Sequence, residues 1–319
     1  MKQLLLSVIA FLVFSGSAQA DPEFDQWVKG LRAEAISQGI SASLVDQAFH
    51  KVKPLPRVLE LDRKQPEKTM TFVQYAKGVV SQARIQQGRQ MMIRYGDLLN
   101  KVGEQYGVQP RFIVALWGIE TFYGRNTGGY NVVESLATLA YDGRRSRFFR
   151  KELLNALQIL QEGHASLSNM KGSWAGAMGQ CQFMPSSFLQ FAVDFDGDGR
   201  KDIWSTPADV FASAANYLSQ SGWQDKEIWG RRTRLPNDFD TTQATLHIEK
   251  SLQTWQKIGV RRSDGGNLPS GSMKGSIVLP DRMGGPAYLV YDNFRVLMKW
   301  NRSTYFATSV GLLADAIAQ

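Results

Sequence analysis

A single carboxylate, Glu120, lies in an apolar and aromatic segment, QPRFIVALWGIETFYG, at residues 109–124. At helical spacing Trp117 lies one turn before it and Tyr123 one turn after it. A carboxylate among such neighbours is poorly solvated, so its ionised form is disfavoured and its pKa rises. A raised pKa is what a general acid needs near neutral pH. The ordinary alternative is a Glu at a helix end that pairs with a base such as Arg125.

A second segment, GSWAGAMGQCQFMPSS at residues 172–187, is rich in small residues. Glycine and alanine let the backbone approach a ligand closely, and the side chains of Ser173 and Gln182 offer hydrogen bonds to hydroxyls or amides. Such a run is hard to explain as scaffold alone. We therefore interpret it as part of a binding groove.

An acidic loop, DFDGDGRKD, follows at residues 194–202. It places an oxygen ligand at every second residue and glycines at the sharp turn, as the first half of an EF-hand does. The twelfth position is Ser205, which has no carboxylate, so Asp209 in the next helix is the best closing ligand. The alternative is a solvated acidic turn. The predicted calcium ligands are Asp194, Asp196, Asp198, Arg200 and Asp209.

A basic cluster of Arg144, Arg145 and Arg147 precedes an aromatic pair, Phe148 and Phe149. Arginines in such a cluster often form only a solvated face. Beside an acid and aromatic residues they also suit the carboxylates of a ligand, because guanidinium groups bind carboxylates through paired hydrogen bonds. Both interpretations stay open at this point.

The chain has 319 residues and a formal net charge of +8. This length can bury a sizeable core and favours two or three lobes. The positive charge favours an anionic partner, for which an anionic polymer of the cell envelope suits an exported chain better than nucleic acid does. The 8 Trp, 10 Tyr and 17 Phe residues provide material for a groove that stacks on sugars, although most aromatic side chains serve as core.

Residues 1–20 have the pattern of a cleaved signal peptide, with a lysine, an apolar run and an Ala-Gln-Ala end. The run is too short to span a bilayer, and we find no other candidate span. No cysteine lies near the cleavage site, so we expect no lipid anchor. The single cysteine, Cys181, excludes an internal disulfide. We expect an exported, soluble protein of the periplasm that is a monomer.

Helical spacing of apolar residues predicts three helical regions outside these motifs, at residues 23–50, 71–106 and 293–318. Residues 57–65 look partly extended. Residues 226–290 are richer in Gly, Pro, Asp and Thr, and their short apolar or alternating runs predict a small β-rich insert. The predicted strands cover residues 245–248, 275–279 and 288–291.

Three segments together resemble the lytic transglycosylase B family of bacterial peptidoglycan-cleaving enzymes: ALWGIETFYGR, GSWAGAMGQCQFMPSSFLQFAVDFDGDGRKDIW and MKWNRSTYFATSV. The resemblance covers essentially the whole chain after residue 20. It implies a mainly α fold, with a lysozyme-like helical core, an added N-terminal helical lobe and a small β-rich insert. The lobes would be residues 21–105, residues 106–225 together with 291–319, and residues 226–290.

The resemblance also implies roles for individual residues. Glu120 matches the catalytic acid/base, and the acidic loop matches a calcium site. Trp300 stands where the family often has a Tyr, and Cys181 replaces a residue next to the groove glutamine. The substrate-binding residues implied or expected are Ser173, Gln182, Asn301, Arg144, Arg145, Phe148 and Tyr123.

The number of carboxylates in the motifs bears on the mechanism. Most glycosidases need two, an acid and either a base or a nucleophile, and here only Glu120 sits in a suitable motif. A lone acid suffices if the N-acetyl group of the muramic acid stabilises the cationic centre and the sugar's own 6-hydroxyl attacks it. The resemblance implies this chemistry, which leaves a 1,6-anhydromuramoyl end on the peptidoglycan strand. The alternatives are a hydrolytic muramidase that uses the same Glu with water, and a non-catalytic peptidoglycan-binding protein.

Overall fold

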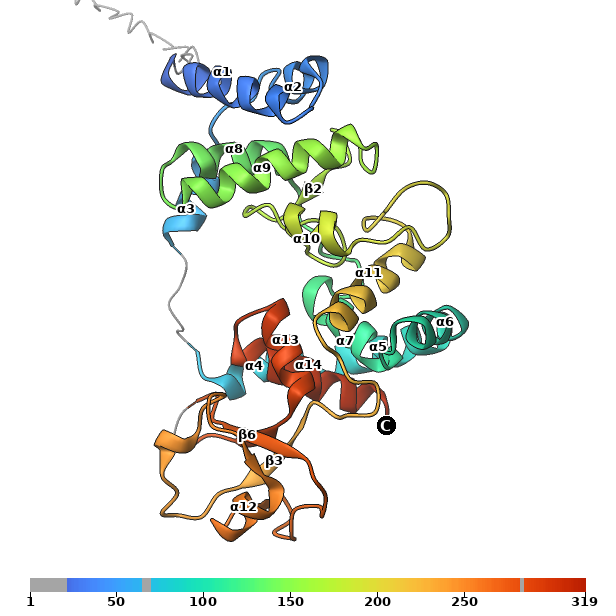
Figure 1. The fold of residues 1–319 in the computed structure, drawn as a ribbon, viewed down its shortest axis with the longest axis vertical. Helices are drawn as coiled ribbons and strands as arrows, with labels where there is room; N and C mark the ends of the chain where they lie inside the picture. Colours follow the sequence, from blue (N-terminus) through green and yellow to red (C-terminus); the bar gives the residue numbers. More distant parts are fainter. Residues whose placement is uncertain (1–21, 65–69, 282–283) are drawn as a thin grey trace, which may run out of the picture.

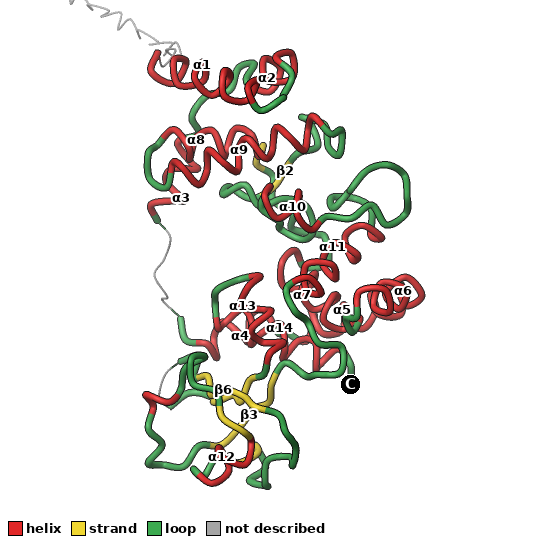
Figure 2. Tube along the Cα trace, in the orientation of Figure 1, coloured by secondary structure: helices red, strands yellow, loops and turns green. Residues whose placement is uncertain are grey.

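The computed structural model describes residues 22–64, 70–281 and 284–319, and the expected signal peptide at residues 1–20 lies outside these ranges. The described chain is elongated, with α1 and α2 at one end and the strands β3 and β6 near the other (Figure 1). Helices dominate, and strands gather mainly at that second end (Figure 2). The predicted mainly α class with a small β-rich part is confirmed.

The helices carry most of the described chain. They are α1 (Pro22–Ser37), α2 (Ala42–Ala48), α3 (Pro56–Arg63), α4 (Phe72–Val79), α5 (Gln82–Arg94), α6 (Gly96–Tyr106), α7 (Pro110–Thr121), α8 (Val132–Tyr141), α9 (Ser146–Gln161), α10 (Pro185–Phe191), α11 (Pro207–Gln220), α12 (Leu252–Lys257), α13 (Asp292–Trp300) and α14 (Thr304–Ile317), with a 3-10 turn at Thr241–Gln243. The strands are β1 (Tyr130–Asn131), β2 (Lys171–Gly172), β3 (Gly230–Arg234), β4 (Lys250–Ser251), β5 (Arg261–Arg262), β6 (Lys274–Val278) and β7 (Ala287–Val290).

Helix α7 is the centre of the helical core. Pro110 occupies its first turn, where a missing N–H costs nothing. Residues 112–118 are all buried, so the helix is covered on every side rather than along one stripe. Its neighbours are α14, α5, α6 and α11. A helix enclosed in this way gives the residues at its end a fixed position.

The helices before residue 106 pack against two different neighbours. Helix α2 contacts α9 and α3 contacts α8, whereas α5 and α6 contact α7 and α4 contacts α14. These contacts divide the segment 21–105, which was expected as a single lobe, between the α8–α9 hairpin and the α7–α14 core. The exact lobe boundaries stay a prediction.

Two local predictions were wrong. Residues 57–65 were expected to be partly extended, but Pro56 starts the helix α3, because proline is already set for a first helical turn. Residues 245–248 were expected to form a strand, but they form a turn in which the N–H of Ile248 donates to the carbonyl oxygen of Thr245. The other two predicted strands are confirmed as β6 and β7.

The main sheet has five strands in the order β4-β6-β7-β3-β5, and every pairing is antiparallel. Successive side chains of a strand point to opposite faces. In β7, Tyr288 and Val290 face the helical core, while Leu289 belongs to a second core that contains Trp255 of α12. The sheet therefore separates a small core of its own from the main helical core.

Helix α14 joins the sheet to the helical core. A Cβ on Gly311 would lie 2.2 Å from the ring of Trp229, so only glycine lets the helix approach this side chain. The indole Nε1 of Trp229 also donates to Asp315 at 2.9 Å. Among the described residues, no helix has both the length and the apolar character that crossing a membrane requires.

Candidate active site

Glu120 lies in the last turn of α7. The three residues that follow the helix, Phe122, Tyr123 and Gly124, have positive φ angles of 51°, 58° and 81°. Residues other than glycine pay a free-energy cost in this conformation, and such residues concentrate at functional sites. The backbone N–H of Tyr123 donates to the carbonyl oxygen of Trp117 at 3.2 Å, which closes the helix end. The turn therefore fixes the position of Glu120.

The carboxylate of Glu120 is partly buried and faces a small, mainly apolar cavity. Trp300 Nε1 donates to its Oε1 at 2.7 Å. Burial raises the pKa of Glu120 from 4.5 to about 7, and the hydrogen bond from Trp300 partly opposes this rise. No other carboxylate belongs to the described residues that line the cavity. The remaining lining residues are Ile113, Leu116, Trp117, Gln180, Cys181, Val210, Phe211 and Ala214.

Gln180 fixes the end of α7 to the 172–187 segment. Its side-chain oxygen accepts from Trp117 Nε1 at 2.7 Å, and its amide nitrogen donates to the carbonyl oxygen of Trp204 at 2.8 Å. The Thr121 hydroxyl donates to the backbone carbonyl of Gln180 at 3.1 Å. A Cβ on Gly124 would lie 2.3 Å from Gln180 Oε1, so the glycine after the helix is required for this contact.

Ser173 and Gln182 lie on the loop that Gln180 holds against α7. The Ser173 hydroxyl oxygen accepts from the N–H of Ala177 at 3.1 Å. Gln182 has a positive φ of 50°, and its amide nitrogen donates to the carbonyl oxygens of Thr127 at 3.1 Å and Gly179 at 2.9 Å. Both side chains thus have fixed orientations, and the amide nitrogen of Gln182 is used in hydrogen bonds to nearby backbone carbonyl groups.

Asn301 directly follows Trp300 at the end of α13. It is exposed, and its side-chain oxygen accepts from the N–H of Ser303 at 3.1 Å. The contact between Trp300 and Glu120 brings Asn301 to the same part of the molecule, and its role in substrate binding stays a prediction.

Tyr123 does not have the position expected of a substrate-binding residue. Its side chain is only 7% exposed, and its hydroxyl donates to the carbonyl oxygen of Arg84 at 2.7 Å. A Cβ on Gly118 would lie 2.7 Å from its ring, which shows how closely the ring packs on α7. The side chain supports the turn after Glu120, because its ring also lies against Trp117.

The Arg144–Arg145 pair holds a buried acid. Arg144 Nε lies 3.0 Å from one carboxylate oxygen of Asp62, and a terminal nitrogen of Arg145 lies 2.6 Å from the other. Asp62 is 1% exposed and belongs to α3, so the pair joins this helix to the start of α9. These contacts give the arginines a structural role that the sequence did not predict. Phe148, by contrast, is 46% exposed, which suits the predicted stacking on a ligand.

The sequence did not predict the roles of three residues near Glu120. Trp300 was noted only as a replacement, and its hydrogen bond to Glu120 joins segments 180 residues apart. Gln180 is of the same residue type as Gln182 and carried no separate signal. Tyr75 of α4 lies close enough for Glu120 to raise its pKa, although burial is the larger cause. No motif surrounds Tyr75, so its position could be found only from the fold.

Cys181 lines the same cavity as Glu120 and is 3% exposed. Its thiol donates to the carbonyl oxygen of Val210 at 3.3 Å. Burial raises the pKa of the thiol, and the nearby Glu120 adds to the rise. Cys181 therefore stays protonated and fills the wall of the cavity as a small apolar side chain.

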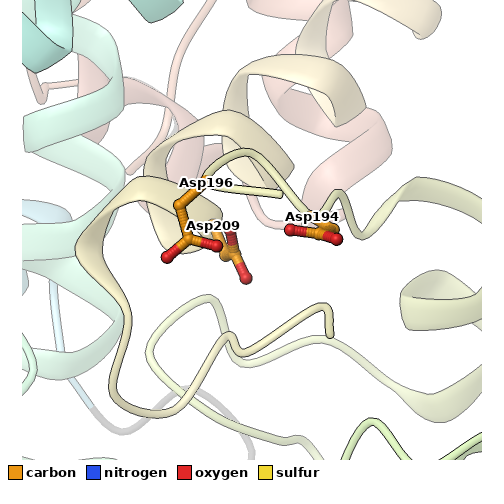
Figure 3. Close-up of side chains that lie close together, drawn as sticks. All are labelled: Asp194, Asp196 and Asp209. Atoms are coloured by element: carbon orange, nitrogen blue, oxygen red, sulfur yellow. The ribbon is translucent and has the colours of Figure 1, made fainter. Parts of the chain in front are cut away.

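The acidic loop brings three carboxylates together. Asp194 and Asp196 lie on the loop and Asp209 comes from the first turn of α11, and one oxygen of each lies within 4.8 Å of the others. Figure 3 shows Asp196 and Asp209 close to one another, with Asp194 across from them. The prediction that Asp209 replaces the missing acid at Ser205 agrees with this geometry.

The side chain of Asp198 does not join this group. Arg200 stands at loop position 7, where an EF-hand uses the backbone carbonyl, so its role as a ligand stays a prediction. The carboxylate of Asp198 accepts from the N–H of Arg200 at 2.8 Å and so caps the loop turn. Asp209, which is fully buried, accepts from the N–H groups of Phe195 at 2.8 Å and Asp202 at 2.7 Å. The loop is therefore folded around the Asp209 carboxylate.

The donor set of the acidic loop fits a calcium ion. Carboxylate oxygens are hard ligands, and Ca²⁺ prefers them. Burial raises the pKa of Asp209, and the negative charges of Asp196 and Asp194 raise it further. Three negative groups held this close repel one another, so a divalent cation between Asp194, Asp196 and Asp209 would relieve the repulsion.

A helical core that holds one carboxylic acid of raised pKa in an apolar cavity defines a protein suited to general acid catalysis. The family model of the transglycosylase SLT domain matches residues 23–315, and the chain belongs to this family. The resemblance to lytic transglycosylases is therefore confirmed.

Individual relatives agree with this assignment. The chain is 31% identical over 297 residues to the membrane-bound lytic murein transglycosylase B of Escherichia coli strain K12. The alignment covers 88% of this chain and 79% of that protein. The crystal structure of SltB3 from Pseudomonas aeruginosa in complex with NAG-anhNAM-pentapeptide superimposes with a TM-score of 0.90 at 47% identity, covering 92% of this chain and 79% of that one. The structure of the Escherichia coli lytic transglycosylase Slt35 with calcium has a TM-score of 0.79 at 29% identity, covering 93% of each chain.

Proposed function

We propose that this protein is a lytic transglycosylase that cleaves the β-1,4 bond between N-acetylmuramic acid and N-acetylglucosamine in peptidoglycan. Glu120 is the single acid/base, and the product carries a 1,6-anhydromuramic acid end. The observation that carries the proposal is the surroundings of Glu120: its pKa is raised to about 7 by burial, and the described cavity wall contains no second carboxylate. The family and the peptidoglycan fragment bound to a relative support the substrate class.

The proposed reaction needs only one protein carboxyl group. The protonated Glu120 donates its proton to the glycosidic oxygen as the bond to the muramic acid carbon breaks. The N-acetyl oxygen of the same sugar stabilises the positive charge at that carbon. The ionised Glu120 then accepts the proton of the sugar's 6-hydroxyl as its oxygen attacks the carbon. The proton returns to Glu120, and no water is consumed.

Neutral side chains on the 172–187 segment and after Trp300 suit this chemistry. Ser173, Gln182 and Asn301 offer hydrogen bonds without charge, so they can hold an N-acetyl group without competing for the proton. Trp300 donates a hydrogen bond to one oxygen of Glu120 and has no proton-accepting nitrogen of its own. The proton of Glu120 therefore belongs on the other oxygen, which is left for the substrate.

A hydrolytic muramidase remains the second candidate, because a single Glu can also activate water. The two reactions differ in their products. Transglycosylation leaves anhydro ends that borohydride cannot reduce, whereas hydrolysis leaves reducible ends. We expect mass spectrometry of digested sacculi to find mainly non-reducible ends. Mainly reducible ends would favour the muramidase, and no released fragments would favour a binding protein.

The proposal includes a structural calcium ion held by Asp194, Asp196 and Asp209. These residues converge, and a related enzyme has been solved with calcium. The ion would tie the loop after α10 to the start of α11, and α11 lines the cavity at Glu120 through Val210 and Phe211. Its contribution is therefore the shape of the cavity wall rather than chemistry on the substrate.

The proposal places the mature protein in the periplasm, where peptidoglycan lies. It rests on the signal-peptide pattern of residues 1–20. N-terminal sequencing of protein from a periplasmic extract should begin near residue 21. A full-length chain recovered from the cytoplasm would contradict the assignment.

A further inference from the structure

A second cleft, away from Glu120, lies between α1 and α9. Its volume is about 770 Å³, and its walls come from α1, from the end of α8 and from one face of α9. None of its lining residues lines the cavity at Glu120. Along the long axis of the molecule, α8 and α9 lie between α1 and α7 (Figure 1). A ligand in this cleft would therefore not occupy the catalytic position.

The cleft combines aromatic surface with positive charge. Trp27 and Tyr141 line it, with their ring centroids 5.9 Å apart. Among the described residues, its lining includes three basic side chains, Arg147, Arg150 and Lys151, and one acidic side chain, Glu34. Three positive charges and one negative charge leave a net charge of +2.

The single acid of the cleft is already neutralised. Arg150 Nε lies 2.6 Å from a carboxylate oxygen of Glu34, and the Arg150 guanidinium also lies 5.4 Å from the centre of the Trp27 ring. This pairing joins α1 to α9. It leaves Arg147 and Lys151, which are exposed and one turn apart on α9, to supply the net positive charge.

We propose that this cleft is an accessory, non-catalytic site that binds the stem peptides of peptidoglycan through their carboxylates. The inference rests on the proposed function for its choice of polymer. Arg147 and Lys151 provide charge-assisted hydrogen bonds to carboxylates, and the parts of Trp27 and Tyr141 that line the cleft provide apolar contact surface for the peptide. Such a site would hold a neighbouring part of the cross-linked polymer while Glu120 acts on another, which raises the effective concentration of substrate.

The test measures binding in protein that cannot cleave. In an E120Q background, the double variant R147E/K151E is compared with K101E/K257E, which makes the same charge change on exposed residues of α6 and α12. Each protein is mixed with intact sacculi and with glycan strands from which an amidase has removed the stem peptides, and the bound fraction is measured. Melting curves confirm that both variants are folded.

We expect R147E/K151E to bind intact sacculi about tenfold more weakly than K101E/K257E, because two charged hydrogen bonds become two repulsions. On peptide-free strands the two variants should bind equally. Binding to intact sacculi within twofold of the control would overturn the accessory site. An equal loss on both materials would overturn the assignment to stem peptides, because the cations would then recognise the glycan. Whether Glu120 cleaves does not enter either comparison, so a failure here is distinct from a failure of the proposed function.

Discussion

Glu120 and the acidic loop at residues 194–209 use the same functional group in opposite surroundings. Glu120 is alone in an apolar cavity, where the neutral form is favoured and its pKa is about 7. Asp194 and Asp196 on the acidic loop and Asp209 in the first turn of α11 are crowded together, and backbone N–H groups of the loop donate to Asp194 and Asp209. Isolation makes a carboxyl group into a proton donor, whereas crowding makes several of them into a cation site. The two regions should therefore respond differently to the same Asp→Asn or Glu→Gln change.

The largest expected effect is the loss of cleavage in Glu120→Gln. The amide keeps the shape and can still accept from Trp300, but it cannot donate and recover a proton. Loss of general acid/base catalysis costs about 100-fold to 10,000-fold, and because the described residues of the cavity wall include no second acid, we expect at least about 10,000-fold. The rate of fragment release from sacculi measures it. Glu104→Gln, at an exposed site on α6, is the control and should keep full activity. Activity of the Glu120 variant within tenfold of wild type would refute the role.

The difference in stability between the same variant and the wild type should depend on pH. The folded-state pKa of Glu120, about 7, lies above its usual value of 4.5, so folding favours the protonated form. Its contribution to stability is fully present below pH 4.5 and is lost as the pH rises through 7. The difference corresponds to about 3 kcal/mol at about 1.4 kcal/mol per pH unit.

Glu120→Gln should therefore match the wild type in stability below pH 4.5 and exceed it by up to about 3 kcal/mol above pH 7. Urea unfolding at pH 4, 6 and 8 measures this difference. A constant difference across the three pH values would show that Glu120 has an ordinary pKa.

Calcium should raise the melting temperature of the protein through the acidic loop and not through Glu120. A cation that binds only the folded chain stabilises it by about 2.7 kcal/mol at a concentration 100 times its Kd. We expect the melting temperature to rise with calcium and fall with a chelator, and Asp196→Asn to remove this response.

Asp198→Asn is the matched control, because Asp198 lies on the same loop but outside the converging group. It should keep most of the calcium response. If Asp198→Asn abolished the response and Asp196→Asn did not, the ligand set would be wrong. If calcium did not change the melting temperature of the wild type, the loop would be an acidic turn that binds no calcium.

The smallest expected effect is that of Trp300→Phe, which keeps the ring but removes the hydrogen bond to Glu120. That hydrogen bond lowers the pKa of Glu120, so its loss should move the alkaline limb of the kcat/KM profile to higher pH. Loss of one hydrogen bond should also lower kcat by about 3-fold to 10-fold. Trp223→Phe removes an indole hydrogen bond to Gln109 and serves as the control. An unmoved pH profile would show that Trp300 only packs against its neighbours.

The sequence predicts the two carboxylate sites because each lies mostly within one short segment. The apolar residues around Glu120 are its helical neighbours, and the spacing of the acidic loop is visible in the chain itself. Asp209 could be inferred because it starts the next helix. These features follow from local periodicity, which a single sequence contains.

Contacts between distant segments could not be predicted in this way. The hydrogen bond from Trp300 to Glu120, the contact of Gln180 with Trp117 and the Asp62 partner of the arginine pair all depend on how helices pack. For Tyr123, sequence proximity to Glu120 led to a wrong prediction. Its place beside Glu120 suggests a substrate contact, but the positive φ angle of the turn directs it to Arg84.

In the proposed reaction Glu120 acts as the only acid and base, with the sugar's own hydroxyl as the nucleophile. Digestion of peptidoglycan in oxygen-18 water, followed by mass spectrometry, tests it directly. We expect new muramic acid ends that carry no label and are about 18 mass units lighter than hydrolysed ends, because no water is added. Labelled, reducible ends as the main product would contradict it.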